Sequence, residues 1–234
     1  MQCENLDHKK YSYKNYSQLV SKIDSLCKDL DQVHPMERKI KFLLDIRGYF
    51  KLNAIKGSYL EFGSYQSEMQ YAAYKILDET QMITSYVGLD TFEGEPEIED
   101  NEKSFFPSLQ SKDFDINYDN VSSFVSKYIG NKSFLIKGDF RKQETLDSIG
   151  KYTPVAVSVI DCNLFSSIEV SIDYTLKNIV QGGIIFIDDY FSNMHDGIPR
   201  IHLLFNKLIS QNKAQIIQHS FYPPFAKSFI VYKE

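Results

Sequence analysis

The sequence predicts an α/β protein built on a doubly wound, mostly parallel, seven-stranded sheet. From Gly57 onward, short apolar runs alternate with segments of helical periodicity, which is the pattern of βαβ units. Two of the runs, at 155–160 and 184–187, are apolar on both faces, as central parallel strands should be. Two more runs, joined by Pro223 and Pro224, come last and predict a carboxy-terminal antiparallel hairpin.

The elements follow in order from the apolar pattern. Apolar residues between Leu19 and Val33 recur at helical spacing, Pro35 interrupts them, and a second helical pattern surrounds Leu43 and Phe50. The predicted strands are 58–62, 86–89, 133–136, 155–160, 184–187, 215–219 and 229–232. The predicted helices between them are 66–77, 120–129, 144–149, 167–180 and 198–209. We therefore expect an amino-terminal helical extension, residues 1–56, and a main domain, residues 57–234.

Composition excludes several classes of protein. The 234 residues carry a formal net charge of −5 and no polybasic block, so neither nucleic acid nor a membrane surface is an expected partner. No apolar run approaches the length of a membrane span, and the polar, aromatic region that follows Met1 contains no apolar signal-peptide core. Cys3, Cys27 and Cys162 are odd in number and far apart, which predicts free thiols in a reducing compartment. We expect a cytoplasmic protein.

The residues after each predicted strand are the candidates for function, because ligands of an open parallel sheet bind beyond the carboxyl ends of its strands. The first run leads into Glu61, Phe62, Gly63, Ser64 and Tyr65. A glycine there permits a tight turn and a close approach of the backbone to a ligand. The segment is not GxGxxG, so it does not favour a dinucleotide pyrophosphate site.

Aspartates end the next two runs. Asp90 follows the second run and could accept hydrogen bonds from both ribose hydroxyls of an adenosyl group. Gly138 and Asp139 follow the third run, and Asp139 could accept from an adenine amino group. Either residue could instead be a turn-forming aspartate. Their recurrence at successive strand ends favours the binding interpretation.

Three further aspartates end the fourth and fifth runs. Asp161 follows the fourth run, and Asp188 and Asp189 follow the fifth. Converging carboxylates repel one another unless a positive charge lies between them, and Mg²⁺ suits a small set of oxygen ligands. Such a metal lowers the pKa of a bound hydroxyl. The alternative is that Asp188 or Asp189 caps the following helix or turn.

Two loops carry further hypotheses. His195 lies just beyond the fifth run and could serve as a general base, or it could be a solvated loop residue. The acidic segment 93–103 lacks apolar periodicity and contains Pro96, so it is a long loop. We interpret it as a lid over a pocket, against the alternative of a solvated insertion.

Four segments in this order resemble a known family. They are YLEFG at 59–63, GLDTFEG at 88–94, VIDCNLFSS at 159–167 and GGIIFIDDY at 182–190. Together they resemble the macrocin and mycinamicin O-methyltransferase family, which are class I S-adenosylmethionine-dependent, metal-dependent enzymes that methylate sugar hydroxyls. The resemblance runs from about residue 57 to about residue 205 and leaves the amino-terminal helices unmatched.

The resemblance implies a cofactor, a metal and a reaction. It implies Mg²⁺ held by Asp161, Asp188 and Asp189, and in-line methyl transfer to an oxygen on that metal, with Asp161 and His195 as the candidate catalytic residues. The residues expected at the S-adenosylmethionine site are Glu61, Phe62, Gly63, Ser64, Tyr65, Asp90, Thr91, Phe92, Gly138, Asp139, Asp161 and Cys162.

The chain departs from the family pattern at the fourth strand. Asn163 and Phe165 stand where the family has an acid and a tyrosine, and Glu95 displaces the expected proline to Pro96. An amide can offer a carbonyl oxygen to a metal but cannot act as a base.

The leading hypothesis is therefore an O-methyltransferase acting on a hydroxyl of a sugar or glycoside-type small molecule. Two alternatives stay open. One is a methyltransferase for a phosphoryl, phenolic or nitrogen acceptor, and the other is a catalytically silent S-adenosylmethionine-binding domain, which Asn163 keeps open. The sequence does not identify the acceptor, and a homodimer is expected because related enzymes often oligomerise.

Overall fold

The computed structural model describes residues 35–98, 102, 110–192, 194–195 and 197–233. Contacts divide the chain into two compact units, Met1–Glu37 and Arg38–Glu234, and the sheet belongs to the second. The helical pattern predicted between Leu19 and Val33 lies outside the described residues, and the division predicted at residue 57 stays a prediction. No helix among the described residues is both long and apolar enough to span a membrane.

Helices and strands alternate along the chain, as the apolar pattern predicts. In order they are α2 (Pro35–Asn53), β1 (Gly57–Phe62), α3 (Glu68–Leu77), η2 (Asp78–Thr80), β2 (Ile83–Asp90), α5 (Tyr118–Tyr128), η3 (Gly130–Lys132), β3 (Ser133–Lys137), α6 (Gln143–Ile149), η4 (Gly150–Tyr152), β4 (Val155–Ile160), α7 (Phe165–Asn178), β5 (Ile179–Ile187), β6 (Met194–His195), β7 (Ile198–Pro199), α8 (Arg200–Gln211), β8 (Ala214–Tyr222) and β9 (Ala226–Lys233).

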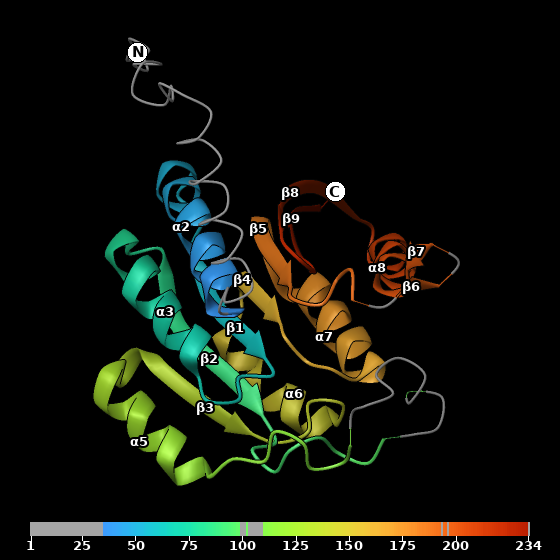
Figure 1. The fold of residues 1–234 in the computed structure, drawn as a ribbon. Coiled ribbons are helices and arrows are strands. Elements are labelled where there is room, and N and C mark those ends of the chain that lie inside the picture. The colour runs from blue at the N-terminus through green and yellow to red at the C-terminus, as the bar shows by residue number, and fades with distance from the viewer. Residues whose placement is uncertain (1–34, 99–101, 103–109, 193, 196, 234) are drawn as a thin grey trace, which may run out of the picture. The chain divides into compact units, whose positions relative to one another are not determined.

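Seven strands form one mixed sheet in the order β3-β2-β1-β4-β5-β9-β8 (Figure 1). The first five strands along the chain pair in parallel, whereas β9 pairs antiparallel with both β5 and β8. The predicted fold class is confirmed, hairpin included. Strand order reverses between β1 and β4, so the carboxyl ends of these two strands are where a ligand is expected.

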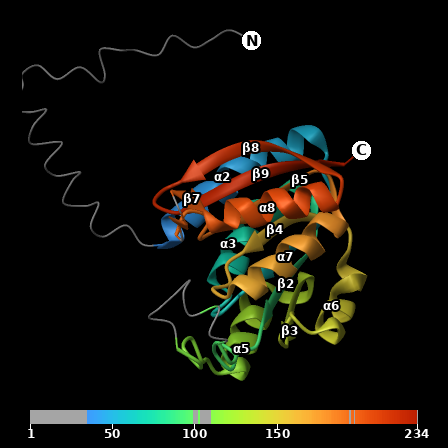
Figure 2. The ribbon, with the colours of Figure 1, turned by 90° about the vertical axis from the view of Figure 1, so that its right-hand side faces the viewer.

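Helices cover both faces of the sheet. Helices α2, α3 and α5 lie on one face and α6, α7 and α8 on the other (Figures 1 and 2). Because strand side chains alternate in direction, neighbouring residues serve different layers. Leu60 and Val87 belong to the aliphatic core beneath α7, whereas Tyr59 and Tyr86 stack on the other face with ring centroids 5.9 Å apart.

The structure differs from the predicted elements in two places. Strand β5 begins at Ile179, inside the helix that we predicted to run to 180, because Ile179 is β-branched and pairs with Val155 of β4. A short hairpin also forms after β5: β6 lies in the predicted loop, and β7 occupies the first two residues of the helix that we predicted over 198–209.

Candidate functional site

The turn at Gly63 brings the carboxyl ends of β1, β2 and β4 close together. Its φ of +86° lies in the left-handed region, and a Cβ placed there would lie 2.4 Å from the carbonyl oxygen of Asp161. The amides of Gly63 and Ser64 both donate to the Leu89 carbonyl, at 2.9 and 3.1 Å. The turn after β1 therefore contacts the ends of β2 and β4, and only glycine fits it.

Asp90 is the last residue of β2, and its carboxylate accepts hydrogen bonds from backbone amides of the turns that follow β1 and β2. The Tyr65 amide donates to Oδ2 at 2.9 Å, and the Phe92 amide donates to Oδ1 at 2.8 Å. Burial raises the pKa of Asp90, and these backbone hydrogen bonds oppose the rise. Thr91 Oγ1 also lies 3.5 Å from Oδ1, a weak contact because this hydroxyl donates to the Gly94 carbonyl at 2.8 Å. Each carboxylate oxygen has two lone pairs, so Oδ2 keeps a second acceptor position and Oδ1 keeps one that only the Thr91 hydroxyl approaches. This arrangement suits a ligand that presents two neighbouring hydroxyls.

The side chains of several predicted cofactor residues contact other parts of the protein. The rings of Phe62 and Phe92 are buried in two separate core clusters. Thr91 Oγ1 donates to the Gly94 carbonyl at 2.8 Å, so it shapes the turn after β2. The Tyr65 ring is exposed and stacks edge-on with Phe114, at 5.8 Å between centroids.

Cys162 and Asp139 have protein partners. The Cys162 sulfur lies 3.8 Å from Ser171 Oγ, and burial raises the pKa of the thiol, which keeps it protonated. Arg141 donates to both carboxylate oxygens of Asp139 from its backbone amide and its guanidinium. These hydrogen bonds outweigh burial and lower the pKa of Asp139. They also fill its acceptor positions, so the geometry does not support the predicted bond to an adenine amino group. Gly138 remains beside Asp90, since its amide donates to the Asp90 carbonyl at 2.9 Å.

Glu61 is buried at the end of β1, with 1% of its surface exposed. Burial raises the pKa of its carboxyl to about 8, against the opposing effects of the Tyr59 hydrogen bond and Lys39. Tyr59 Oη donates to Glu61 Oε2 at 2.7 Å. The carboxyl group is therefore largely protonated at neutral pH.

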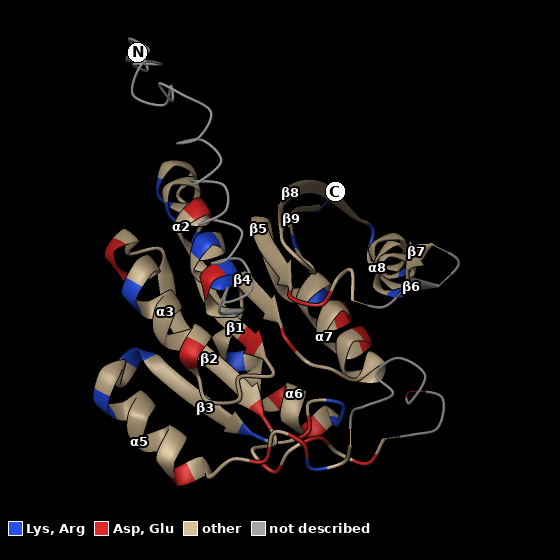
Figure 3. Cartoon of the chain, viewed as in Figure 1, with Lys and Arg blue, Asp and Glu red and all other residues tan. Residues whose placement is uncertain are grey.

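A group of four charged side chains, which we name the ion cluster, lies at the ends of β4 and β5. It consists of Arg38, Lys39, Asp161 and Asp188. The Arg38 guanidinium donates to both oxygens of Asp188, each at 2.9 Å, and Lys39 Nζ donates to Asp161 Oδ2. Lys39 Nζ also lies 3.5 Å from Asp188 Oδ2. Figure 3 shows the acidic segments that follow β4 and β5 and the basic segments of α2.

The ion cluster sets the pKa values of its members. Burial alone would lower the pKa of Lys39, but Asp161 and Asp188 outweigh it and raise that pKa. Burial and the neighbouring Asp188 raise the pKa of Asp161 against the effect of Lys39. Burial also favours neutral Asp188, but Arg38 and Lys39 outweigh it and lower its pKa. Burial and Asp188 raise the pKa of Asp189 to about 6.

The predicted Mg²⁺ does not fit this arrangement. Mg²⁺ needs free carboxylate oxygens, and here both oxygens of Asp188 and one of Asp161 already accept from cationic side chains. No group of three or more His, Cys, Asp or Glu side chains in the described part of the chain is arranged to hold a metal ion. The geometry therefore does not support the metal set of Asp161, Asp188 and Asp189.

Sequence reasoning missed Arg38 and Lys39, although one signal was present. Lys39 falls on the same helical stripe as Phe42, Leu43 and Ile46, which are fully buried. A lysine on an apolar stripe predicts a buried acidic partner, because an unpaired buried charge is costly.

The acidic segment 93–103 touches the β4–α7 junction through its described residues. Asn163 Nδ2 donates to Glu95 Oε1 at 2.6 Å, and the Ser166 amide donates to Glu102 Oε1 at 2.9 Å. Burial raises the pKa of Glu95 against the Asn163 hydrogen bond. Asn163 therefore binds this segment, which accounts for an amide in place of an acid. Whether the segment is a lid stays a prediction, since 99–101 and 103–109 lie outside the described residues.

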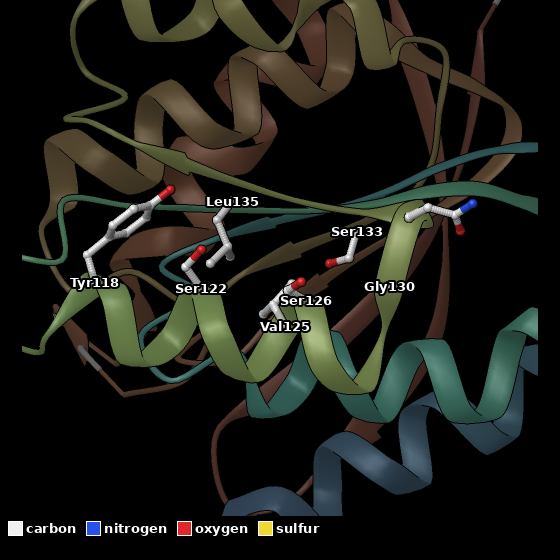
Figure 4. Close-up of a pocket in the computed structure, with 8 residues that line it drawn as sticks. Tyr118, Ser122, Val125, Ser126, Gly130, Ser133 and Leu135 are labelled. Carbon is white, nitrogen blue, oxygen red and sulfur yellow. The ribbon is translucent and has the colours of Figure 1, made fainter.

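Neither His195 nor the cavity between α5 and β3 adds a described side-chain contact to the site. His195 pairs through its backbone with Ile198, but its side chain lies outside the described part, so its catalytic role stays a prediction. A cavity of about 440 Å³ lies between α5 and β3 (Figure 4). Tyr118, Ser122 and Ser133 are among its lining residues, and β3 is an edge strand far from the reversal of strand order.

The sheet order, the two helical layers and the final hairpin are those of the Rossmann-like methyltransferase fold. The O-methyltransferase NovP superposes with a TM-score of 0.65 at 13% identity, over 84% of this chain and 80% of NovP. The calicheamicin methyltransferase CalS11 superposes with a TM-score of 0.60 at 15% identity, over 98% of each chain. At these identities the likeness shows the fold alone. No protein-family model matches the sequence, and no curated protein matches it.

Proposed function

We propose that this chain is an S-adenosylmethionine-dependent O-methyltransferase. Asp90 carries the proposal: it ends β2, next to β1 at the reversal of strand order, its carboxylate is fixed by two backbone amides, and both oxygens retain acceptor capacity. A pair of neighbouring ribose hydroxyls matches that capacity. Gly63 lets the backbone of the β1 turn approach the same place, and the lack of a GxGxxG segment there disfavours a pyrophosphate.

The chain's own residues bind and orient in this reaction. S-adenosylmethionine, when bound, supplies a methyl group that its sulfonium already activates. Asp90 would hold the ribose, and the turn formed by Gly63, Ser64 and Tyr65 would lie along the cofactor. Glu61, which is largely protonated, adds little charge beside the ion cluster. The protein then contributes mainly position and electrostatics to the transfer.

The proposed acceptor is a hydroxyl of a sugar or glycoside-type small molecule. CalS11, also described as a TDP-rhamnose 3′-O-methyltransferase, superposes in its ligand-free form with a TM-score of 0.55 at 14% identity, over 94% of this chain and 88% of that one. This neighbour and the resemblance of the four sequence segments support the acceptor class. The homodimer is likewise a proposal.

Isothermal titration calorimetry with S-adenosylhomocysteine tests the cofactor. We expect wild-type protein to bind and Asp90→Ala to bind about a hundredfold or more weakly, because two hydrogen bonds to a charged group are worth roughly 1.5–3 kcal/mol each. Asp119→Ala, which removes an exposed aspartate of α5, is the control and should bind as the wild type does. Absence of binding to folded wild-type protein would overturn the proposal.

A further inference from the structure

Two adjacent basic residues of α2 reach the strand ends that were predicted to hold a metal. Arg38 pairs with Asp188 across 150 residues of sequence, and Lys39 pairs with Asp161 across 122. The Lys39 ammonium is within 4 Å of both carboxylates, so it lies between two of the three predicted metal ligands. The positive charge required between converging acids is thus already present as a side chain.

The pairing is built into the fold. The side chain of Lys39 is 11% exposed and that of Asp188 is 6% exposed, so solvent screens the pair little. Phe42, one turn further along α2, packs against Phe186 of β5 with ring centroids 4.5 Å apart. This contact fixes α2 over β5 and so fixes the place that the two basic side chains reach.

A divalent ion and the Lys39 ammonium cannot occupy this place together. Mg²⁺ binds carboxylate oxygens at about 2.0–2.1 Å, which brings it into the space between Asp161 and Asp188. Arg38 uses both oxygens of Asp188 in a forked contact, so metal binding would have to break two hydrogen bonds as well as displace the lysine. The two largely buried cations would also repel the incoming ion.

We propose that Arg38 and Lys39 supply the positive charge of this site in place of a divalent cation, and that the chain takes up no Mg²⁺ there. Lys39 is a positioning residue that holds the carboxylates of Asp161 and Asp188 together. The inference deepens the proposed function, but metal exclusion rests on the ion cluster alone. Metal exclusion can therefore be disproved while cofactor binding is confirmed, and cofactor binding can be disproved while metal exclusion is confirmed.

The test is a titration with Mn²⁺, followed by electron paramagnetic resonance of the free ion, without cofactor or acceptor. We expect wild-type protein to leave Mn²⁺ free. Arg38→Met/Lys39→Met, which removes both charges and keeps most of the apolar stem of each side chain, should gain a Mn²⁺ site. That gain should disappear when Asp161→Asn is added to this double variant. Lys41→Met is the matched control, because Lys41 lies on the same helix in an exposed pair with Asp45 and should gain nothing.

Two outcomes overturn the inference: stoichiometric Mn²⁺ binding to wild-type protein that is lost in Asp161→Asn, or no gain of a site in folded Arg38→Met/Lys39→Met. Circular dichroism establishes folding, and Lys39→Arg, which retains the charge, should behave as the wild type. If Arg38→Met/Lys39→Met does not fold, the wild-type and Asp161→Asn titrations still decide the question. Calorimetry with S-adenosylhomocysteine in Mg²⁺ and in chelator should give equal affinities, and a loss in chelator would contradict metal independence.

Discussion

Glu61 shows how a single buried carboxyl links the site to pH. Its pKa is raised from 4.5 to about 8, chiefly by burial. In the unfolded chain the same group is ionised above about pH 4.5. The folded state therefore binds one more proton between these values, and stability falls as pH rises through the window.

We predict that Glu61→Gln flattens the dependence of stability on pH between about 4.5 and 8. Glutamine resembles the protonated carboxyl and can still accept from Tyr59. The free energy of unfolding of the variant should exceed that of the wild type above pH 8 by on the order of a few kcal/mol. Urea unfolding at a series of pH values measures this difference. Glu68→Gln, at an exposed residue of α3, should leave the slope unchanged, and a wild-type slope in Glu61→Gln would contradict the raised pKa.

Among single residues, the sequence predicted Asp90 as part of the site but did not predict Lys39. Asp90 follows an apolar run, and the rule that ligands bind at strand ends depends on local pattern alone. The role of Lys39 depends on its hydrogen bond to Asp161, and no local sequence pattern links residues that lie so far apart in the chain. Asp139 is the opposite case, since it ends a strand as predicted but pairs with Arg141.

Among the elements, α7 begins without a side-chain cap of its own. Leu164 is at its N-cap position, and Glu102 supplies a carboxylate from the acidic segment to the Ser166 amide. A negative charge at a helix amino terminus stabilises the helix through its dipole.

We predict that Glu102→Ala lowers the free energy of unfolding by about 1 kcal/mol, the usual cost of losing an N-cap. The midpoint of urea unfolding should fall, with its slope unchanged. Glu97→Ala removes an exposed acid of the same segment and should have no effect. Equal midpoints for Glu102→Ala and wild type would mean that this contact does not stabilise α7.

Element boundaries follow the sequence where the apolar runs are long. The predicted run 155–160 coincides with β4, because its residues are apolar on both faces and flanked by polar ones. The start of β5 was missed because Ile179 and Val180 continue the helical spacing of α7, and only the pairing of Ile179 with Val155 of β4 begins a strand there.

For the molecule as a whole, the proposed function predicts stabilisation by ligand. A ligand that binds only the folded state at about 100 times its Kd contributes about 2.7 kcal/mol. For a protein of this size that raises Tm by roughly 5–10 °C. Differential scanning fluorimetry with S-adenosylhomocysteine should show this rise in the wild type and not in Asp90→Ala. An equal rise in both proteins would place the ligand away from Asp90.

The global arrangement was predictable because its signals repeat along the chain, whereas the ion cluster was not. Alternation of strand and helix occurs several times between β1 and β5, so errors at one boundary do not change the fold class. The site depends on single contacts such as Arg38 with Asp188, and nothing in the periodicity repeats them.

The strand order near the end of the sheet has a consequence for how the chain is made. Strand β9 pairs with β5 on one side and with β8 on the other, although β8 precedes it in the sequence. During synthesis from the amino terminus, the backbone N–H and C=O groups on one edge of β5 therefore lack their strand partner until β9 has been made. In that interval β5, whose residues from Gly182 to Ile187 are all buried in the finished fold, offers an apolar open edge. The nascent protein is most vulnerable to aggregation at this stage, after β5 has been made and before β9 closes against it.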